Sequence, residues 1–356
     1  NISRCQLMGT PIKRITEWWH SDNFDSTIDV RTPAEFADDH LPGAINLPVF
    51  TNQQRIDIGT MYKQTGSFEA KRAGAALVAR NIATHLQDSL ADKPRDWRPL
   101  VYCWRGGQRS GAMAQILSDI GWHVKLIDGG YKRYRRDVLA KLETIPQTLR
   151  VIKVGGVTGT AKTHILKAAR DLGAQVIDLE GLAKHRGSLL GIEPDADQPA
   201  QRLFESEIAY CLDQFDCARP VFVEAESNKI GQLHIPADLF AKMRTAKTVL
   251  ITASLSARVA FLKRDYHHMT SQPERLLPLF DGLVKRYGHE TVKGWKTLSS
   301  VGNWDALVSD LLETHYDPAY TRSARAHGHD VIMTIDGGAL DNTAIQKAAT
   351  QLLTIS

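Results

Sequence analysis

Two segments of this 356-residue chain share the pattern that most constrains its fold: an apolar, β-prone run enters a glycine-containing loop, and a helical repeat follows. The first runs from residues 100–102 through Cys103 into a helical repeat over 113–120. The second runs from residues 149–154 through a glycine-rich loop into a helix that stops before Gly173. Strands alternating with helices in this way favour an α/β fold with a mostly parallel sheet. Because 356 residues exceed one ordinary core, we expect two domains.

Cys103 lies where the first of these strands meets its loop. Such a loop turns backbone N–H groups toward its centre and leads to the positive end of a helix dipole. Arg105 and Arg109 add positive charge nearby. Each effect favours thiolate over thiol, so we predict that Cys103 is a nucleophile. The loop predicted to cradle a small oxyanion consists of Trp104, Arg105, Gly106, Gly107, Gln108, Arg109 and Ser110.

The second loop, residues 156–163, matches the P-loop pattern G-x-x-x-x-G-K-[ST] except at Ala161, which replaces the second glycine. Its backbone amides would bind phosphate, and Lys162 would supply a point charge. The methyl group of Ala161 crowds the close backbone approach that glycine allows, so a plain glycine-rich turn is the alternative. The predicted diphosphate-binding residues are Gly156, Thr158, Gly159, Thr160, Ala161, Lys162 and Thr163.

Two other polar segments of the second domain follow predicted strands. An apolar strand over 221–224 ends in an acid, and Glu224 and Glu226 either accompany a magnesium ion or pair with nearby lysines; the sequence leaves both open. The polar segment 180–188 contains His185 and Arg186 and is expected to be a loop at the sheet edge where α/β proteins bind ligands. We predict no metal site at the histidine pair 267–268, because no third ligand stands at a suitable spacing.

The N-terminal half carries a compact charged segment and a segment without periodicity. Asp29, Arg31 and Glu35 are interpreted as ion-pairing residues that tie a strand to a helix, rather than as catalytic groups. Residues 55–66 show no clean period, so we expect an ordered loop there. An amphipathic helix is predicted to follow over 70–86.

A basic run follows the predicted cysteine domain and packs four cations and two aromatic residues into positions 131–136. A solvated helix face and a nucleic-acid contact both explain it, and its place after the reactive domain favours phosphate binding slightly. We expect domains at 1–130 and 149–356, joined by a basic helical linker over 131–148. The candidate nucleic-acid-binding residues are Lys132, Arg133, Arg135 and Arg136.

Composition narrows the class of protein. Hydrophobic residues make up 43% and charged residues 24%, as in soluble globular proteins, and no apolar run approaches the ~20 residues of a membrane span. The four cysteines show neither a Cys-x-x-Cys pair nor zinc spacing, and the first residues show no signal peptide, so we expect a reduced, cytoplasmic compartment. A net charge of +4 permits a nucleic-acid partner without requiring one.

Several segments resemble known families. Residues 29–31, 35–36, 40–48 and the Cys103 loop together resemble a rhodanese domain, whose cysteine carries sulfur as a persulfide. Most of the chain more narrowly resembles the tRNA 2-selenouridine synthases, also called tRNA 2-thiouridine selenotransferases. The segments that carry this resemblance are 59–64, 103–110, the P-loop, 179–188, 222–227 and 315–320. It implies an N-terminal rhodanese-like domain followed by a P-loop α/β domain with a helical C-terminal region.

The resemblance also implies a reaction at the wobble uridine of tRNA. Geranyl diphosphate first alkylates the sulfur of 2-thiouridine, and selenium from selenophosphate then replaces the S-geranyl group. The diphosphate leaving group suits the P-loop with Lys162 and Thr163, whose positive field stabilises developing charge. Selenophosphate suits Cys103, whose thiolate is expected to carry selenium as a perselenide. No tightly bound cofactor is expected, and a role for Mg²⁺ stays open.

Two other classes of protein fit parts of the sequence. One is a P-loop NTPase or kinase attached to a sulfur-carrier rhodanese domain, and the altered residue Ala161 counts against it. The other is a non-catalytic tRNA-binding or sensor protein on a rhodanese fold. Such proteins often lose the cysteine, so Cys103 counts against this alternative.

Overall fold

The structure is a computed structural model that describes residues 12–16, 24–187, 197–327 and 330–355. The described residues divide into two compact units: 1–141 with 199–210, and 142–198 with 211–356. The divisions fall inside two helices, α5 (Gly130–Thr148) and α8 (Gln201–Asp213). Most of α8 therefore belongs to the first unit, whereas the sequence assigned it to the second domain. Ion pairs explain this, because Arg202 and Glu205 on α8 bind Asp38 and Arg135 of the first unit.

The first unit contains one five-stranded sheet with β4 at its centre. The strand order is β1-β5-β4-β2-β3, and every adjacent pair is parallel. All four residues of β4 are buried, as expected of a central strand in a parallel sheet. The elements are β1 (Lys13–Ile15), β2 (Ser26–Asp29), α1 (Pro33–Asp38), β3 (Ile45–Asn46), α2 (Asn52–Gln64), α3 (Ser67–Gln87), β4 (Pro99–Tyr102), α4 (Gln108–Ile120) and β5 (Lys125–Ile127).

The core of this unit lies between the sheet and the helices α3 and α4. Ile28 and Val101 from the sheet pack with Ile82 of α3 and with Met113 and Leu117 of α4 in one buried cluster. The apolar side chains recur at helical spacing, so one stripe of each helix is buried. The predicted helix over 70–86 is confirmed within α3.

The expected loop at 55–66 is wrong, because residues 52–64 form helix α2. Thr51 caps the helix: its side chain accepts from the Gln54 N–H, while the Gln54 side chain accepts from the Thr51 N–H. No residue of α2 is fully buried, so its sequence carries no strong apolar period. The spacing Thr51-x-x-Gln54 is a capping box and was the signal that could have revealed this helix.

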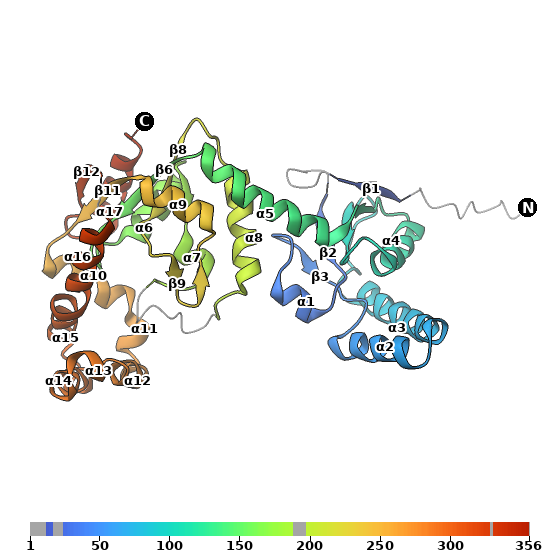
Figure 1. Cartoon of the computed structure of the whole chain (residues 1–356), viewed down its shortest axis with the longest axis horizontal. Coiled ribbons are helices and arrows are strands. Elements are labelled where there is room, and N and C mark those ends of the chain that lie inside the picture. Colours follow the sequence, from blue (N-terminus) through green and yellow to red (C-terminus); the bar gives the residue numbers. More distant parts are fainter. Residues whose placement is uncertain (1–11, 17–23, 188–196, 328–329, 356) are drawn as a thin grey trace, which may run out of the picture. The chain divides into compact units, whose positions relative to one another are not determined.

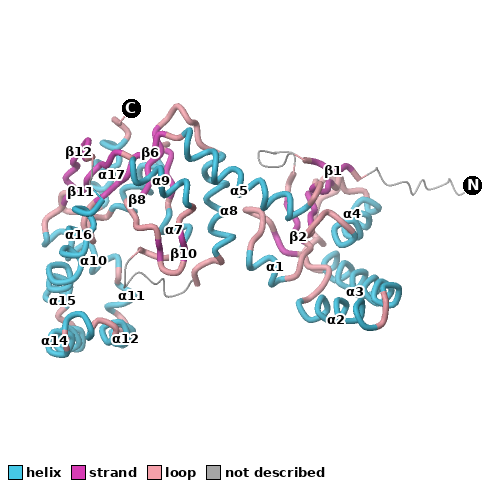
Figure 2. Tube along the Cα trace, viewed as in Figure 1, coloured by secondary structure: helices cyan, strands magenta, loops and turns pink. Residues whose placement is uncertain are grey.

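The second unit contains another five-stranded parallel sheet, in the order β12-β11-β6-β8-β7. Figure 2 shows its strands β6, β8, β11 and β12 in magenta. The strand β6 is central, and helices α6 and α17 contact each other beside it. The sheet and its closest helices are β6 (Arg150–Gly155), α6 (Lys162–Asp171), β7 (Gln175–Ile177), α7 (Leu179–Ala183), β8 (Pro220–Glu224), α9 (Ala237–Thr245), β11 (Lys247–Thr252), β12 (Val331–Asp336) and α17 (Asn342–Leu352). The strands β9 (Lys229–Ile230) and β10 (Leu233–His234) form a separate antiparallel pair.

A run of helices lies between β11 and β12, where the sequence predicts a helical insertion (Figure 1). It has its own buried cluster, which includes Phe280, Trp295, Leu307 and Leu311. The helices are α10 (Leu255–Asp265), α11 (His267–Thr270), η1 (Pro273–Leu276), α12 (Leu277–Asp281), α13 (Val284–Tyr287), α14 (His289–Ser300), α15 (Trp304–Leu311), η2 (Leu312–Tyr316) and α16 (Asp317–His327). Among the residues described, no helix has both the length and the apolar character needed to cross a bilayer.

Candidate functional site

The Cys103 loop follows β4, the central strand of the first unit, and ends where α4 begins at Gln108. The Cys103 side chain is only 3% exposed, and the Ser110 hydroxyl donates a hydrogen bond to its Sγ at 3.1 Å. Trp104 and Arg105 are exposed. The thiol therefore lies at the base of a loop whose outer residues face solvent.

The first turn of α5 holds this loop in place. The Tyr131 N–H donates to the Cys103 carbonyl at 2.8 Å, and the Lys132 N–H donates to the Trp104 carbonyl at 2.9 Å. A Cβ atom at Gly130 would lie 2.3 Å from the Cys103 carbonyl oxygen, so only glycine fits there. The helix that carries the basic run thus also fixes the position of the cysteine.

Three arginines and one glutamate share the hollow above Cys103. Arg55, Arg105 and Arg109 line it together with Glu35. Arg109 is not a free cation, because its guanidinium donates to the Glu35 carboxylate at 2.8 Å. Burial opposes ionisation of Glu35, but Arg109 outweighs it and the pKa of Glu35 is lowered. The remaining positive charge suits a small oxyanion. Arg55 was missed from the sequence because it lies on α2, which was expected to be a loop.

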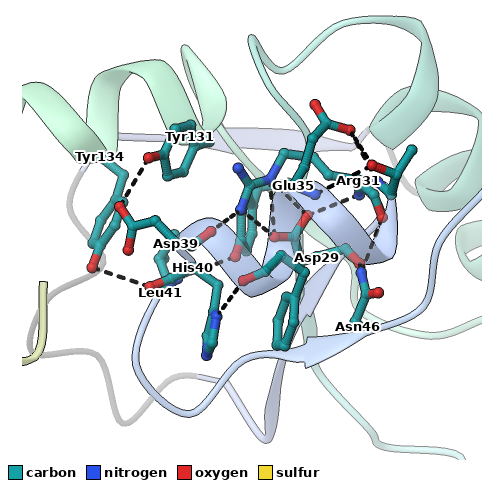
Figure 3. Close-up of polar contacts among 12 residues, drawn as sticks. Asp29, Arg31, Glu35, Asp39, His40, Leu41, Asn46, Tyr131 and Tyr134 are labelled. Carbon is teal, nitrogen blue, oxygen red and sulfur yellow. Dashed lines mark hydrogen bonds and ion pairs between the residues drawn. The ribbon is translucent and has the colours of Figure 1, made fainter. Parts of the chain in front are cut away.

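A buried polar network links residues 29–41 to Tyr131 and Tyr134 of α5, the helix that contacts the Cys103 loop (Figure 3). Arg31 and Asp29 form an ion pair at 2.6 Å, both almost fully buried, which confirms the predicted pairing. The Arg31 guanidinium lies 3.9 Å from the centre of the Tyr131 ring, and the Tyr131 hydroxyl donates to Asp39 at 2.9 Å. Burial raises the pKa of Asp39 to about 6. Glu35 does not join the Arg31 pair as predicted but binds Arg109.

The four basic residues of α5 face different surroundings. Lys132 and Arg136 are exposed. Arg133 lies 3.9 Å from both Asp128 and Asp137. Arg135 is half-buried, pairs with Glu205 on α8 and donates to the Arg202 carbonyl at 3.1 Å. Two of the four basic residues therefore face solvent, and the other two contact acidic residues of the first unit.

The P-loop follows β6, the central strand of the second unit, and α6 begins at Lys162. A Cβ atom at Gly156 would lie 2.6 Å from the Ile251 carbonyl oxygen, so this position requires glycine. Ala161, the residue that departs from the pattern, has φ of +56° and ψ of +26°, in the left-handed region. The chain thus adopts the glycine conformation there with a side chain that disfavours it.

Lys162 and Thr163 lie at the start of α6 with their side chains already bound to protein groups. The Lys162 ammonium donates to the Gly156 carbonyl at 2.8 Å. Burial lowers the pKa of Lys162, and the nearby Glu226 and Glu180 oppose that shift. The Thr163 hydroxyl donates to Glu180 at 2.7 Å. The Lys162 ammonium thus lies near the carboxyl groups of Glu180 and Glu226, and the Thr163 hydroxyl binds Glu180.

The two candidate carboxylates, Glu224 and Glu226, occupy different places. Glu226 lines the hollow beside Lys162, and burial followed by the charge of Glu180 raises its pKa to about 7. Glu224 is fully buried and accepts a hydrogen bond from the Leu179 N–H at 3.0 Å. Burial also raises the pKa of Glu224 well above its ordinary value. Only Glu226 therefore faces the hollow, and the polar partner of Glu224 is a backbone amide rather than a lysine.

The segment 180–188 begins as helix, which corrects the expected loop. Residues 179–183 form α7, capped by Asp178, whose carboxylate accepts from the Gly181 N–H at 2.8 Å. The predicted site residues His185 and Arg186 follow this helix and line the P-loop hollow. The last residue of the predicted segment, Ser188, lies outside the described residues, as does Cys5.

An acid on α10 organises the far wall of this hollow. Asp265 binds Arg186 at 2.6 Å and His164 of α6 at 3.2 Å, and Arg186 also lies over the Tyr266 ring. Burial opposes ionisation of Asp265, but the hydrogen bond from His164 and the charge of Arg186 prevail and lower its pKa. Sequence reasoning did not include His164, Asp265 and Tyr266 in this site, because their sequence separation gives no signal of proximity.

The P-loop hollow is a single site that gathers the predicted phosphate loop, His185, Arg186 and Glu226. It offers backbone amides and a lysine to an anion, and carboxyl groups to a proton or a cation. Among the described residues, no group of three or more His, Cys, Asp or Glu side chains could hold a metal ion.

Two family models match the chain. A model described as the tRNA 2-selenouridine synthase AAA domain matches residues 149–276, and a model of the rhodanese-like domain matches residues 14–137. The first covers the residues that line the P-loop hollow except Tyr320, and the second covers the Cys103 loop and the start of α5.

Individual relatives carry one name. A tRNA 2-selenouridine synthase of Psychromonas ingrahamii is 31% identical over 323 residues, which cover 82% of this chain and 86% of that protein. A protein of the same name from Alcanivorax borkumensis is 32% identical and covers 82% and 88%. A third, from Nitrosomonas europaea, is 35% identical over 243 residues, and the match spans 67% of this chain and 63% of that relative.

Proposed function

The chain belongs to the tRNA 2-selenouridine synthase family, and we propose from that membership that it converts 2-thiouridine at the wobble position of tRNA into 2-selenouridine. The proposal is supported by two anion-binding loops in one chain, each at the end of a central strand. One loop carries a nucleophile and the other a lysine. Two group transfers, each involving a phosphate-bearing reagent, need two such sites.

The first transfer uses geranyl diphosphate. The sulfur of 2-thiouridine attacks C1 of the geranyl group, the C–O bond breaks, and diphosphate leaves with the electron pair while the base loses its N3 proton. The P-loop amides, Lys162 and Thr163 stabilise the charge that develops on the departing diphosphate. Glu226, whose pKa is raised to about 7, is available near neutral pH to accept the proton.

The second transfer uses selenophosphate. Selenium attacks C2 of the base, geranyl thiolate leaves, and water takes the phosphoryl group as phosphate. The alkylation must come first, because a thioether leaves a ring carbon more readily than a thiocarbonyl sulfur does. The hollow lined by Arg55 and Arg105 binds the selenophosphate oxyanion. The Cys103 thiolate attacks phosphorus and the P–Se bond breaks, which releases selenium at the selenide level for attack on C2; water then cleaves the S–P bond, giving phosphate and restoring the thiolate. A perselenide on Cys103 would instead need a two-electron oxidant, because the selenium of selenophosphate is already at the selenide level.

The tRNA substrate requires cationic and aromatic contacts near the Cys103 loop. Lys132 and Arg136 are exposed on α5 and would contact phosphates. Trp104, which is 37% exposed, would stack on a base. Arg133 and Arg135 act mainly through their contacts with acidic residues of the same unit.

Mass spectrometry of nucleosides tests this function directly. Thiolated tRNA is incubated with the pure protein and geranyl diphosphate, with and without selenophosphate. We expect S-geranyl-2-thiouridine in the first case and 2-selenouridine in the second. The absence of both products, together with hydrolysis of ATP or GTP by the same preparation, would instead establish the P-loop NTPase alternative.

A further inference from the structure

An apolar cavity adjoins the P-loop hollow inside the helical insertion. Six of its lining side chains are Met269, Leu276, Phe280, Leu307, Val308 and Leu311. They come from α11, η1, α12 and α15, and residues of α10, η2 and the P-loop complete the lining. Apolar walls of this kind favour the binding of a hydrocarbon group, because its surface is removed from water.

The cavity and the P-loop hollow share part of their walls. Thr158 of the P-loop, together with Leu262 and Tyr266, lines both. A Cβ atom at Gly159 would lie 2.9 Å from Leu262 Cδ1, so the P-loop backbone packs directly against α10 at this point. A ligand with its phosphates on the P-loop therefore has an apolar space next to it.

The polar groups around the cavity are engaged with other partners. The Lys263 ammonium binds the Asp305 carboxylate at 2.7 Å. The Arg258 guanidinium donates to the Thr158 carbonyl at 2.8 Å and pairs with Asp317 at 2.6 Å. A nucleotide base and ribose would lose their hydrogen bonds to water in such surroundings and gain few in return, which disfavours them.

We propose that this cavity holds hydrocarbon of the tail of the allylic diphosphate and limits the length of tail that the chain accepts. This inference rests on the proposed function and identifies the residues that limit the length of the substrate's hydrocarbon tail. Burying the tail removes apolar surface from water, while the diphosphate stays on the P-loop. Side chains at positions 270 and 308 then set how far the tail can extend.

The test fills the cavity from two different helices. Val308→Trp and Thr270→Phe are compared with Val301→Trp, which places the same indole at a position that is 70% exposed and outside the cavity. Calorimetry measures binding of geranyl diphosphate and of inorganic diphosphate, and nucleoside mass spectrometry compares transfer from geranyl and from five-carbon dimethylallyl diphosphate. Thermal melting identifies folded variants.

We expect the two cavity variants to bind geranyl diphosphate at least about tenfold more weakly and to shift the preference toward the five-carbon donor, because less tail is buried. Binding of inorganic diphosphate and the Val301→Trp variant should stay at the wild-type level. Unchanged chain-length preference in a folded cavity variant would overturn the inference while leaving the proposed function standing. Failure of the wild-type chain to bind geranyl diphosphate at all would overturn both.

Discussion

The Cys103 loop and the P-loop occupy the same place in two similar sheets. Each follows the central strand of a five-stranded parallel sheet, β4 in one unit and β6 in the other, and each leads into a helix. On the two sides of each central strand, the chain connections lead in opposite directions across the sheet. Open α/β sheets bind ligands in the crevice at such a position, and both loops lie there. The backbone arrangement alone therefore predicts an anion site in each unit, without distinguishing their chemistry.

The side chains delivered by distant segments make the difference. At the Cys103 loop, Arg55 and Arg105 leave the hollow positive even though Glu35 pairs with Arg109. At the P-loop, Glu180 and Glu226 surround Lys162 and oppose its positive charge. The first loop is thus suited to hold a small anion beside a nucleophile, and the second to hold an anion and exchange a proton.

The largest expected effect is a loss of one reaction without the other when the residue of one loop is changed. Cys103→Ala is expected to lower 2-selenouridine formation at least about a thousandfold, because the nucleophile is removed, and to leave geranylation within about twofold of wild type. Nucleoside mass spectrometry with each reagent measures both. Cys217→Ala, at an exposed cysteine of the other unit, is the matched control. Equal loss of both products would end the division of labour between the loops.

The converse variant is Lys162→Ala. We expect geranyl transfer to fall about a hundredfold, since one positive group that stabilises the departing diphosphate is lost. Selenium transfer to tRNA that already carries S-geranyl-2-thiouridine should continue. Lys247→Ala removes an exposed lysine from β11 of the same unit and serves as the control. Normal geranylation by Lys162→Ala would show that the P-loop is not the diphosphate site.

A smaller effect should appear as pH dependence at the P-loop alone. The pKa of Glu226 is raised to about 7, so this carboxyl becomes negative as the pH rises from 6 to 8 and repels an anionic ligand. Wild-type affinity for inorganic diphosphate should therefore fall about three- to tenfold more over this range than that of Glu226→Gln.

Inorganic diphosphate itself also titrates, but its titration affects every variant equally and cancels when their affinities are compared. Glu290→Gln, at an exposed position on α14, should titrate like wild type. Parallel pH curves for wild type and Glu226→Gln would mean that Glu226 does not ionise in the site near neutral pH.

The smallest effect concerns the backbone of the P-loop. Ala161→Gly relieves a left-handed conformation that disfavours side chains, whereas Ala168→Gly removes the same methyl group from a regular position of α6. Both alanines are buried in one core cluster, so the lost contacts are similar. The free energy of unfolding should be about 1–2 kcal/mol higher for Ala161→Gly than for Ala168→Gly. Urea denaturation measures it, and equal values would remove the strain argument.

Local patterns in the sequence were sufficient for much of the fold. The strand, loop and helix around Cys103 and around Gly156 were predictable because apolar period and glycine placement act over a few residues. Helix α2 was missed because no face of it is fully buried, and its capping box was the only strong local signal. The ion pair of Arg202 on α8 with Asp38 was also missed, because 164 positions separate the two residues in the chain.

The sequence by itself was enough to predict the two strand–loop–helix segments with their Cys103 and Lys162, and the buried pairing of Arg31 with Asp29, since each lies within one short segment. Only the tertiary structure decided which groups face them. Arg55 reaches the Cys103 hollow, and Asp265 reaches the P-loop hollow, from segments separated by tens of residues. Charge, burial and cavity shape depend on distance in space, and a folded chain sets those distances through packing that no local pattern encodes.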